Sequence, residues 1–109
     1  MSLYGKIKAA QDSKNIDMYL ACLHEDFVFV RHQSGTEISK VDWTPTLTQM
    51  MQSDALQFHD QRCLYENDEI MVEHSFMQFP DGTSEAVLVV NHIKDGKIIR
   101  VETGATPIK

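Results

Sequence analysis

The pattern of apolar and polar positions divides the chain into a helical first part and a strand-rich second part. In residues 3–13 the apolar side chains of Leu3, Ile7 and Ala10 recur at spacings of three and four. This is the period of an amphipathic α-helix with one buried face. We therefore expect a first helix over 3–13, interrupted at Asn15.

A second helix and a first strand follow. Asn15 can cap a helix whose apolar stripe runs over residues 16–23, and the stripe ends near the polar break at residues 24–26. The next run, residues 27–30, is continuously apolar and β-branched or aromatic, which predicts a strand covered on both faces. A turn then leads to a short return strand over residues 37–39.

A third helix is predicted to lie over the core like a lid. Asp42 is a plausible N-cap, and the helix should end before Asp54. Pro45 fits the first turn, where its missing N–H needs no partner. The apolar positions of this helix are Trp43, Leu47, Met50 and Met51.

The last half of the chain reads as strands joined by turns. Pro80 to Gly82 and Asp95-Gly96 are strong turn signals, because Pro presets φ and Asp-Gly supplies the positive φ of a tight hairpin. Residues 70–106 therefore read as a three-strand antiparallel meander. The four strands expected here cover residues 56–66, 69–79, 84–94 and 97–106.

Composition agrees with one ordinary globular domain over residues 1–109, since 42% of the residues are hydrophobic and 24% are charged. The net charge of −6 argues against nucleic acid and against an anionic membrane, because both require a concentrated basic surface. Neither a leader nor a membrane span is apparent, so we expect a cytoplasmic protein. In that compartment Cys22 and Cys63 are expected to be free thiols rather than a disulfide.

The stretches KNIDMYLACLHEDFVFVRHQSG and VVNHIKDGKIIRVETG, in this order of elements, resemble the nuclear transport factor 2-like superfamily. This superfamily includes ketosteroid isomerases and SnoaL-like polyketide cyclases. The resemblance implies an α+β, cystatin-like fold in which a curved antiparallel sheet forms a cone closed by three N-terminal helices. It further implies an internal pocket at the wide end of the cone and a homodimer formed through the outer sheet face.

The isomerase residues do not transfer onto this sequence. The resemblance implies a general base near the end of the first strand, where this chain has Arg31 followed by His32. It implies a tyrosine on the first helix, where this chain has Ile7, and Tyr4 lies one turn earlier. A typical ketosteroid isomerase is therefore not expected.

On a later strand the resemblance implies a protonated carboxylic acid, and this chain has Asn91 there. An amide can donate a hydrogen bond to an oxyanion at any pH. If Asn91 faces inward with Val89, alternation along the strand turns His92 outward.

Two choices stay open at this point. Only one residue of the pair Arg31 and His32 can face inward, and the same holds for Glu73 and His74. An inward Arg31 favours an anionic ligand, whereas an inward histidine or a Glu73 with a raised pKa favours proton transfer. The candidate catalytic residues are His32, His74 and Asn91. The candidate ligand-binding residues are Tyr19, Phe29, Arg31, Trp43, Met50, Glu73, Phe76 and Val89, although core packing uses the same residue types.

No metal, cofactor or phosphate-binding pattern stands out, so we expect no cofactor and no metal. Three hypotheses remain. The chain could be a cofactor-independent enzyme of isomerase or cyclase type that acts next to a carbonyl. It could instead bind a small apolar or anionic molecule without turnover, or serve only as a dimerisation module.

Overall fold

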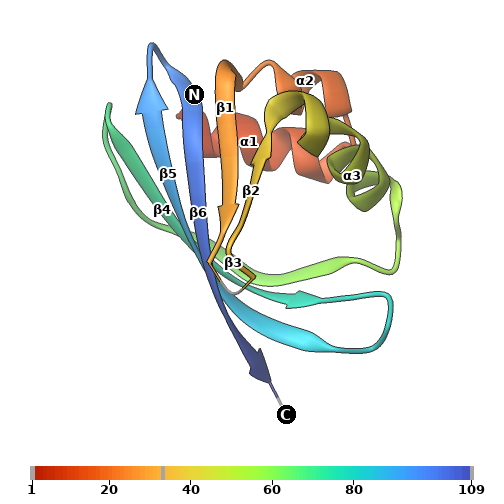
Figure 1. Ribbon diagram of the computed structural model, residues 1–109. Helices are drawn as coiled ribbons and strands as arrows, with labels where there is room; N and C mark the ends of the chain where they lie inside the picture. The colour runs from red at the N-terminus through yellow and green to blue at the C-terminus, as the bar shows by residue number, and fades with distance from the viewer. Residues whose placement is uncertain (1, 33, 109) are drawn as a thin grey trace.

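The computed structural model describes residues 2–32 and 34–108, and within them three helices and six strands form an α+β structure (Figure 1). The helices are α1 (Leu3–Asp12), α2 (Ile16–Leu20) and α3 (Lys40–Gln52). The strands are β1 (Leu23–Arg31), β2 (Thr36–Ser39), β3 (Gln57–Glu66), β4 (Ile70–Gln78), β5 (Ser84–Lys94) and β6 (Lys97–Ile108).

All six strands join one curved sheet in the order β2-β1-β6-β5-β4-β3. The pairing is antiparallel except between β1 and β6, which run parallel. The helices lie against the concave side of this sheet, so its other side forms an outer face (Figure 1). No helix of the described residues is long and apolar enough to cross a membrane.

The first two helices begin at side-chain caps. The Ser2 hydroxyl accepts a hydrogen bond from the Gly5 N–H, and the Asn15 side chain accepts one from the Met18 N–H. Each cap satisfies a backbone donor that has no partner within its own helix. The cap predicted at Asn15 is therefore confirmed.

The predicted end of the second helix is wrong. Helix α2 ends at Leu20, and Leu23 already pairs with Ile98 as the first residue of β1. The next pair joins Val28 to Arg100, so the chain advances five residues along β1 but only two along β6 between these two pairs. The polar residues 24–26 therefore form an irregularity inside the strand rather than a break before it.

The predicted start of the third helix is also wrong. Ser39 caps α3 by accepting from the Asp42 N–H, so Asp42 lies in the first turn, where its charge is favourable. Pro45 is then the sixth helical residue and leaves the Val41 carbonyl without its usual partner. Since Val41 is 80% exposed, water can hydrogen-bond to that carbonyl.

The predicted meander is confirmed. Asp95 and Gly96 have φ values of 55° and 76°, as a tight turn between β5 and β6 requires. In the turn between β4 and β5, Gly82 has a φ of 87°, and the Asp81 carboxylate accepts from the Thr83 N–H and hydroxyl. These two turns set the register of β4, β5 and β6.

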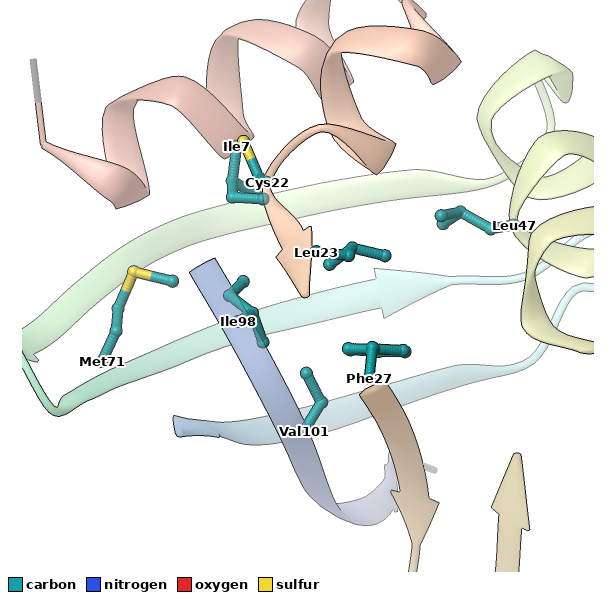
Figure 2. Close-up of a cluster of buried hydrophobic side chains, with 8 residues drawn as sticks. All are labelled: Ile7, Cys22, Leu23, Phe27, Leu47, Met71, Ile98 and Val101. Carbon is teal, nitrogen blue, oxygen red and sulfur yellow. The ribbon is translucent and has the colours of Figure 1, made fainter. Parts of the chain in front are cut away.

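The core fills the space between the helices and the concave face of the sheet (Figure 2). Met71 of β4 is fully buried, and Ile7 of α1 and Leu47 of α3 enter the same cluster from the helices. The whole cluster comprises Ile7, Cys22, Leu23, Phe27, Leu47, Met71, Ile98 and Val101. Cys22 and Cys63 are free thiols.

The substitution Met71→Ala should lower the free energy of unfolding by about 2–5 kcal/mol, because it leaves a cavity in a site that no solvent reaches. Chemical denaturation monitored by circular dichroism measures the change. Val41→Ala is the matched control on the exposed surface of α3 and should alter stability by no more than about 0.5 kcal/mol. Equal effects of the two substitutions would contradict this packing.

Candidate functional site

The register of the sheet decides which side chains face the helices. Asn91 of β5 pairs with Met71 of β4 and with Val101 of β6, and both of these neighbours are in the core. Paired residues of neighbouring strands share a face. Asn91 therefore lies on the concave face, and so does Glu73, two positions after Met71.

Glu73 and Asn91 meet in a buried contact. The Asn91 side-chain Nδ2 donates to Glu73 Oε2 over 2.8 Å and to the Met71 carbonyl over 3.0 Å. Glu73 is 9% exposed and Asn91 is 2% exposed. Both amide hydrogens of Asn91 are thereby engaged, and the amide holds the carboxyl group in a fixed position.

Burial raises the pKa of the Glu73 carboxyl, and the nearby charge of Glu66 raises it further. The hydrogen bond from Asn91 acts in the opposite direction, because it stabilises the ionised form. Desolvation is the largest of these effects. A carboxyl group in this setting can exchange a proton closer to neutral pH than an exposed one.

Two phenols lie within electrostatic range of Glu73. Burial raises the pKa of Tyr19 on α2 and of Tyr4 on α1, and in both cases the charge of Glu73 is the next cause. Cys63 of β3 pairs with Glu73 on the neighbouring strand β4, and burial raises the pKa of the Cys63 thiol. These groups are therefore neutral at neutral pH, and the phenols can donate hydrogen bonds.

Arg31 lies on the same face as Glu73, at the end of β1. It pairs with Thr103 of β6, which in turn pairs with Val89 opposite Glu73. Its guanidinium Nη2 is 3.9 Å from Oε1 of Glu85, whose side chain is 13% exposed. The concave face thus carries a carboxyl group at one position and a cation paired with a second carboxylate at another.

The aromatic candidates are divided between the faces. Phe29 of β1 stacks on Trp43 of α3 with ring centroids 4.2 Å apart, and both pack against the core. Tyr19 and Val89 also pack against the core. From α3, Met51 packs against the core, whereas the predicted Met50 beside it is half-buried.

Two of the candidate histidines do not join this group. His74 pairs with Leu88 on the outer face, and Phe76 lies beside it with ring centroids 5.2 Å apart. His32 also lies on the outer face, where its Nε2 is 2.9 Å from Glu102 Oε1. The expected grouping of these three residues with Asn91 is corrected accordingly, because alternation along β4 and β1 turns them away from it.

Two open hollows lie on other parts of the surface. The first measures about 280 Å³ and is on the outer face, and the second measures about 340 Å³ and lies near the start of β1. Neither includes Glu73 or Asn91. No three His, Cys, Asp or Glu side chains within residues 2–32 and 34–108 are arranged to hold a metal ion.

The sequence contained a signal for the inward position of Glu73. The five residues 79–83 that separate β4 from β5 make Gln78 pair with Ser84, and every later pair follows from that one. This register brings Glu73 to the face of Asn91 and turns His74 away. The position of Cys63 beside Glu73 depends on the register between β3 and β4, which shifts at two places, and the neighbourhood of Tyr4 depends on how α1 packs.

Comparison of the chain with known proteins gives matches in structure alone. No protein-family model matches the sequence, and no curated protein matches it. A solved NTF2-like protein of unknown function from Mesorhizobium loti superposes with a TM-score of 0.81 at 11% identity, covering 95% of this chain and 88% of that one.

Two further solved structures carry names that refer to an activity. A provisionally assigned polyketide cyclase from Pseudomonas putida has a TM-score of 0.75 at 18% identity, covering 95% of this chain and 91% of that one. A provisionally assigned ketosteroid isomerase from Kribbella flavida has a TM-score of 0.76 at 16% identity, with coverages of 98% and 77%. The chain therefore has the nuclear transport factor 2-like fold that its sequence resembles.

The raised pKa of Glu73 predicts a particular pH dependence of stability. Folding favours its protonated form, so this contribution is complete below the pKa of the unfolded chain and is lost as pH rises through the folded pKa. In the variant Glu73→Gln the side chain at this position is neutral at every pH, so the variant does not lose stability in this way as pH rises. From pH 4 upward, the unfolding free energy of the variant should rise relative to wild type and then level off.

Urea denaturation at a series of pH values measures this difference. Glu69→Gln is the control, since Glu69 is exposed just before β4 and its replacement should give no such rise. A difference between Glu73→Gln and wild type that is constant with pH would refute the assignment.

Proposed function

We propose that this protein is a small cofactor-independent enzyme that moves a proton on a carbon next to a carbonyl group. The observation that carries the proposal is the buried contact between Glu73 and Asn91 on the concave face. We further propose that residues 1–109 act as one domain whose sheet forms a cone closed by the helices. The substrate then enters at the wide end of that cone.

In the proposed reaction the ionised Glu73 removes a proton from the carbon, and the electron pair of the broken C–H bond forms a C=C bond. The carbonyl oxygen takes the negative charge of the resulting enolate. A neutral phenol, Tyr4 or Tyr19, donates a hydrogen bond to this oxygen. Where a C=C bond is conjugated with the enolate, Glu73 then returns its proton to the far carbon of that C=C bond, which completes an isomerisation. Where the substrate has a second carbonyl group, the enolate carbon attacks the carbon of that group and closes a ring, and the proton held by Glu73 passes to the oxygen of the second carbonyl.

The raised pKa of Glu73 suits this role, because a base is most effective when its pKa lies near the working pH. Asn91 has a different part from the oxyanion donor expected from its position in the sequence. Its two amide hydrogens already bind Glu73 and the Met71 carbonyl, so we assign it as a positioning residue. The proposed reaction uses neither His32 nor His74.

The names of two structural neighbours, a polyketide cyclase and a ketosteroid isomerase, refer to reactions next to carbonyl groups and support this reaction class. Since one fold serves many functions, the support from the fold is weaker than the support from Glu73 itself. For the substrate we propose a small apolar or anionic molecule. Phe29, Trp43 and Val89 would contact its apolar part, and Arg31 would pair with its anionic group.

The alternative is a protein that binds such a molecule without turnover. The ion pair between Arg31 and Glu85 favours it, because a ligand carboxylate can replace Glu85 as the partner of the guanidinium.

We also propose a cytoplasmic protein that forms a homodimer through the outer sheet face. A chain that did nothing but dimerise would have no use for a buried carboxyl group.

Exchange of hydrogen for deuterium next to a carbonyl tests the enzyme proposal before the substrate is known. The protein is incubated in D₂O with a panel of ketones and oxo acids, and ¹H NMR follows the loss of the signal from the neighbouring C–H. Glu73→Gln should slow any catalysed exchange by about 10²–10⁴-fold, the usual contribution of a general base.

Glu69→Gln again serves as the matched control and should exchange at the wild-type rate. Asn91→Leu should shift the pH profile of the rate, because it removes the hydrogen bond that stabilises ionised Glu73. A catalysed exchange that survives intact in Glu73→Gln would rule out this base, and ligands that bind without any exchange would favour the binding alternative.

Arg31 should distinguish anionic from neutral ligands. In wild type, a ligand with a carboxylate should bind more tightly than the primary amide of the same skeleton, and Arg31→Gln should weaken the binding of the carboxylate by about tenfold. Ligand-observed NMR titration of such matched pairs measures the dissociation constants of both ligands. An equal loss of affinity for the acid and the amide would indicate that Arg31 contributes by packing rather than by charge.

A further inference from the structure

One row of residues on the concave face joins Glu73 to Arg31. Glu73 of β4 pairs with Val89 of β5. Thr103 of β6 pairs with Val89 on one side and with Arg31 of β1 on the other. Neighbouring strands lie about 4.8 Å apart, so the three steps from β4 to β1 place the Cα atoms of Glu73 and Arg31 about 14 Å apart along the sheet. The proposed base and the cation are therefore at opposite ends of the same row.

The surface between these two residues is apolar and partly open. Val89 and Thr103 are half-buried, and so is Ala105, two positions after Thr103 on the same face. The Thr103 hydroxyl donates to the Val30 carbonyl over 3.3 Å, so its polar atom is already engaged. The helices lie over one end of the sheet, and the C-terminal end of β6 extends beyond them (Figure 1). We call Val89, Thr103 and Ala105 the concave strip, and it can contact an aliphatic chain.

One oxygen of the Glu73 carboxyl group is available to a substrate. Its Oε2 accepts from the Asn91 amide over 2.8 Å. Among the residues that the structure describes, no group donates to Oε1, and this oxygen keeps some contact with solvent. Asn91 lies in the row of Met71, so the carboxyl group leans toward the core and away from the open end of the sheet.

The Arg31 guanidinium extends in the opposite direction. Its Nη2 is 3.9 Å from Oε1 of Glu85, and Glu85 lies toward the open end of the sheet, four positions before Val89 on β5. This distance is longer than a hydrogen bond, so a ligand carboxylate that approaches to about 2.8 Å binds the guanidinium more strongly than Glu85 does. The base and the cation thus diverge along the strands as well as lying apart across them.

A carboxylate attached beside the reacting carbon cannot reach both groups. Contacts of about 2.8 Å at the two ends of a ligand take up about 6 Å of the separation between Arg31 and Glu73. The curvature of the sheet and the reach of the two side chains shorten the remainder, so the ligand itself has to span about 5–7 Å. An extended chain advances about 1.2 Å per bond, so this span corresponds to about four to six bonds.

We infer that the preferred substrate is an oxo acid whose carboxylate lies about four to six bonds from the carbon that loses the proton. The carboxylate binds Arg31 in place of Glu85, an aliphatic spacer lies on the concave strip, and the reacting carbon lies at Oε1 of Glu73. This inference rests on the proposed function and adds the length of the substrate to it. A 2-oxo acid, whose carboxylate is attached directly to the carbonyl carbon, is too short to engage both groups at once.

A series of methyl ketone acids tests this length. The methyl carbon lies two, four, five, six and eight bonds from the carboxylate carbon in 2-oxopropanoate, 4-oxopentanoate, 5-oxohexanoate, 6-oxoheptanoate and 8-oxononanoate. In D₂O, Glu73 removes a proton from the methyl group, exchanges it with solvent and returns a deuteron to the same carbon. The loss of the methyl signal in ¹H NMR gives kcat/KM, which is divided by the uncatalysed rate constant of the same compound.

We expect this ratio to peak between 4-oxopentanoate and 6-oxoheptanoate, at a value at least tenfold above that of 2-oxopropanoate. The primary amides of the same compounds should show no such peak, and Arg31→Gln should reduce the acids to the level of the amides. Glu85→Gln removes the carboxylate that competes for Arg31, so it should lower the KM of the best acid about threefold and leave the amides unchanged. A gain of this kind cannot result from misfolding.

A ratio that is independent of length, or that is highest at either end of the series, would overturn the inference. If Glu73→Gln still abolished the exchange in that case, the proposed base would stand. The same length dependence in acids and amides would also overturn the inference, because selection would then not depend on the anionic group. Absence of catalysed exchange from every acid, amide and neutral ketone would instead overturn the proposed function, and the inference with it.

Discussion

The antiparallel pairing of β4, β5 and β6 is the constraint on which the rest of this structure depends. Met71, Asn91 and Val101 occupy one row across these strands, on the concave face. Because side chains alternate along a strand, this row decides which of the remaining positions face the helices and which face outward. The concave positions receive the core and one buried carboxyl group. The outer positions receive His74, His92 and Glu102, the partner of His92. A slip of one residue would exchange these two sets of side chains.

The position of Glu73 opposes stability and has to be supported by its neighbours. A carboxyl group next to a fully buried methionine loses its hydration, which is costly unless it is protonated or hydrogen-bonded. Asn91 supplies one hydrogen bond and is itself anchored to the Met71 carbonyl. A leucine at position 73 would pack in this place without that cost. The carboxyl group is therefore better explained by chemistry than by folding.

The sequence predicted the elements of this fold better than their boundaries and its site. Turn residues such as Asp95-Gly96 act locally, so the meander, the six strands and the three helices could be predicted from them and from the apolar periods. The end of α2 could not, because Leu23 fits a helical stripe as well as a strand and only its pairing with Ile98 decides. The choice between Glu73 and His74 likewise depended on register, and the neighbourhood of Tyr4 depended on how α1 packs.

Two glutamates show how the same side chain acquires opposite properties on the two faces of one sheet. Burial dominates at Glu73 and raises its pKa, whereas hydrogen bonds from His32 and His92 dominate at Glu102 and lower its pKa. The first carboxyl group is thus suited to exchange protons with a substrate. The second stays charged between the two imidazoles that it contacts. The curved sheet separates the two carboxyl groups, so each takes its properties from the side chains on its own face.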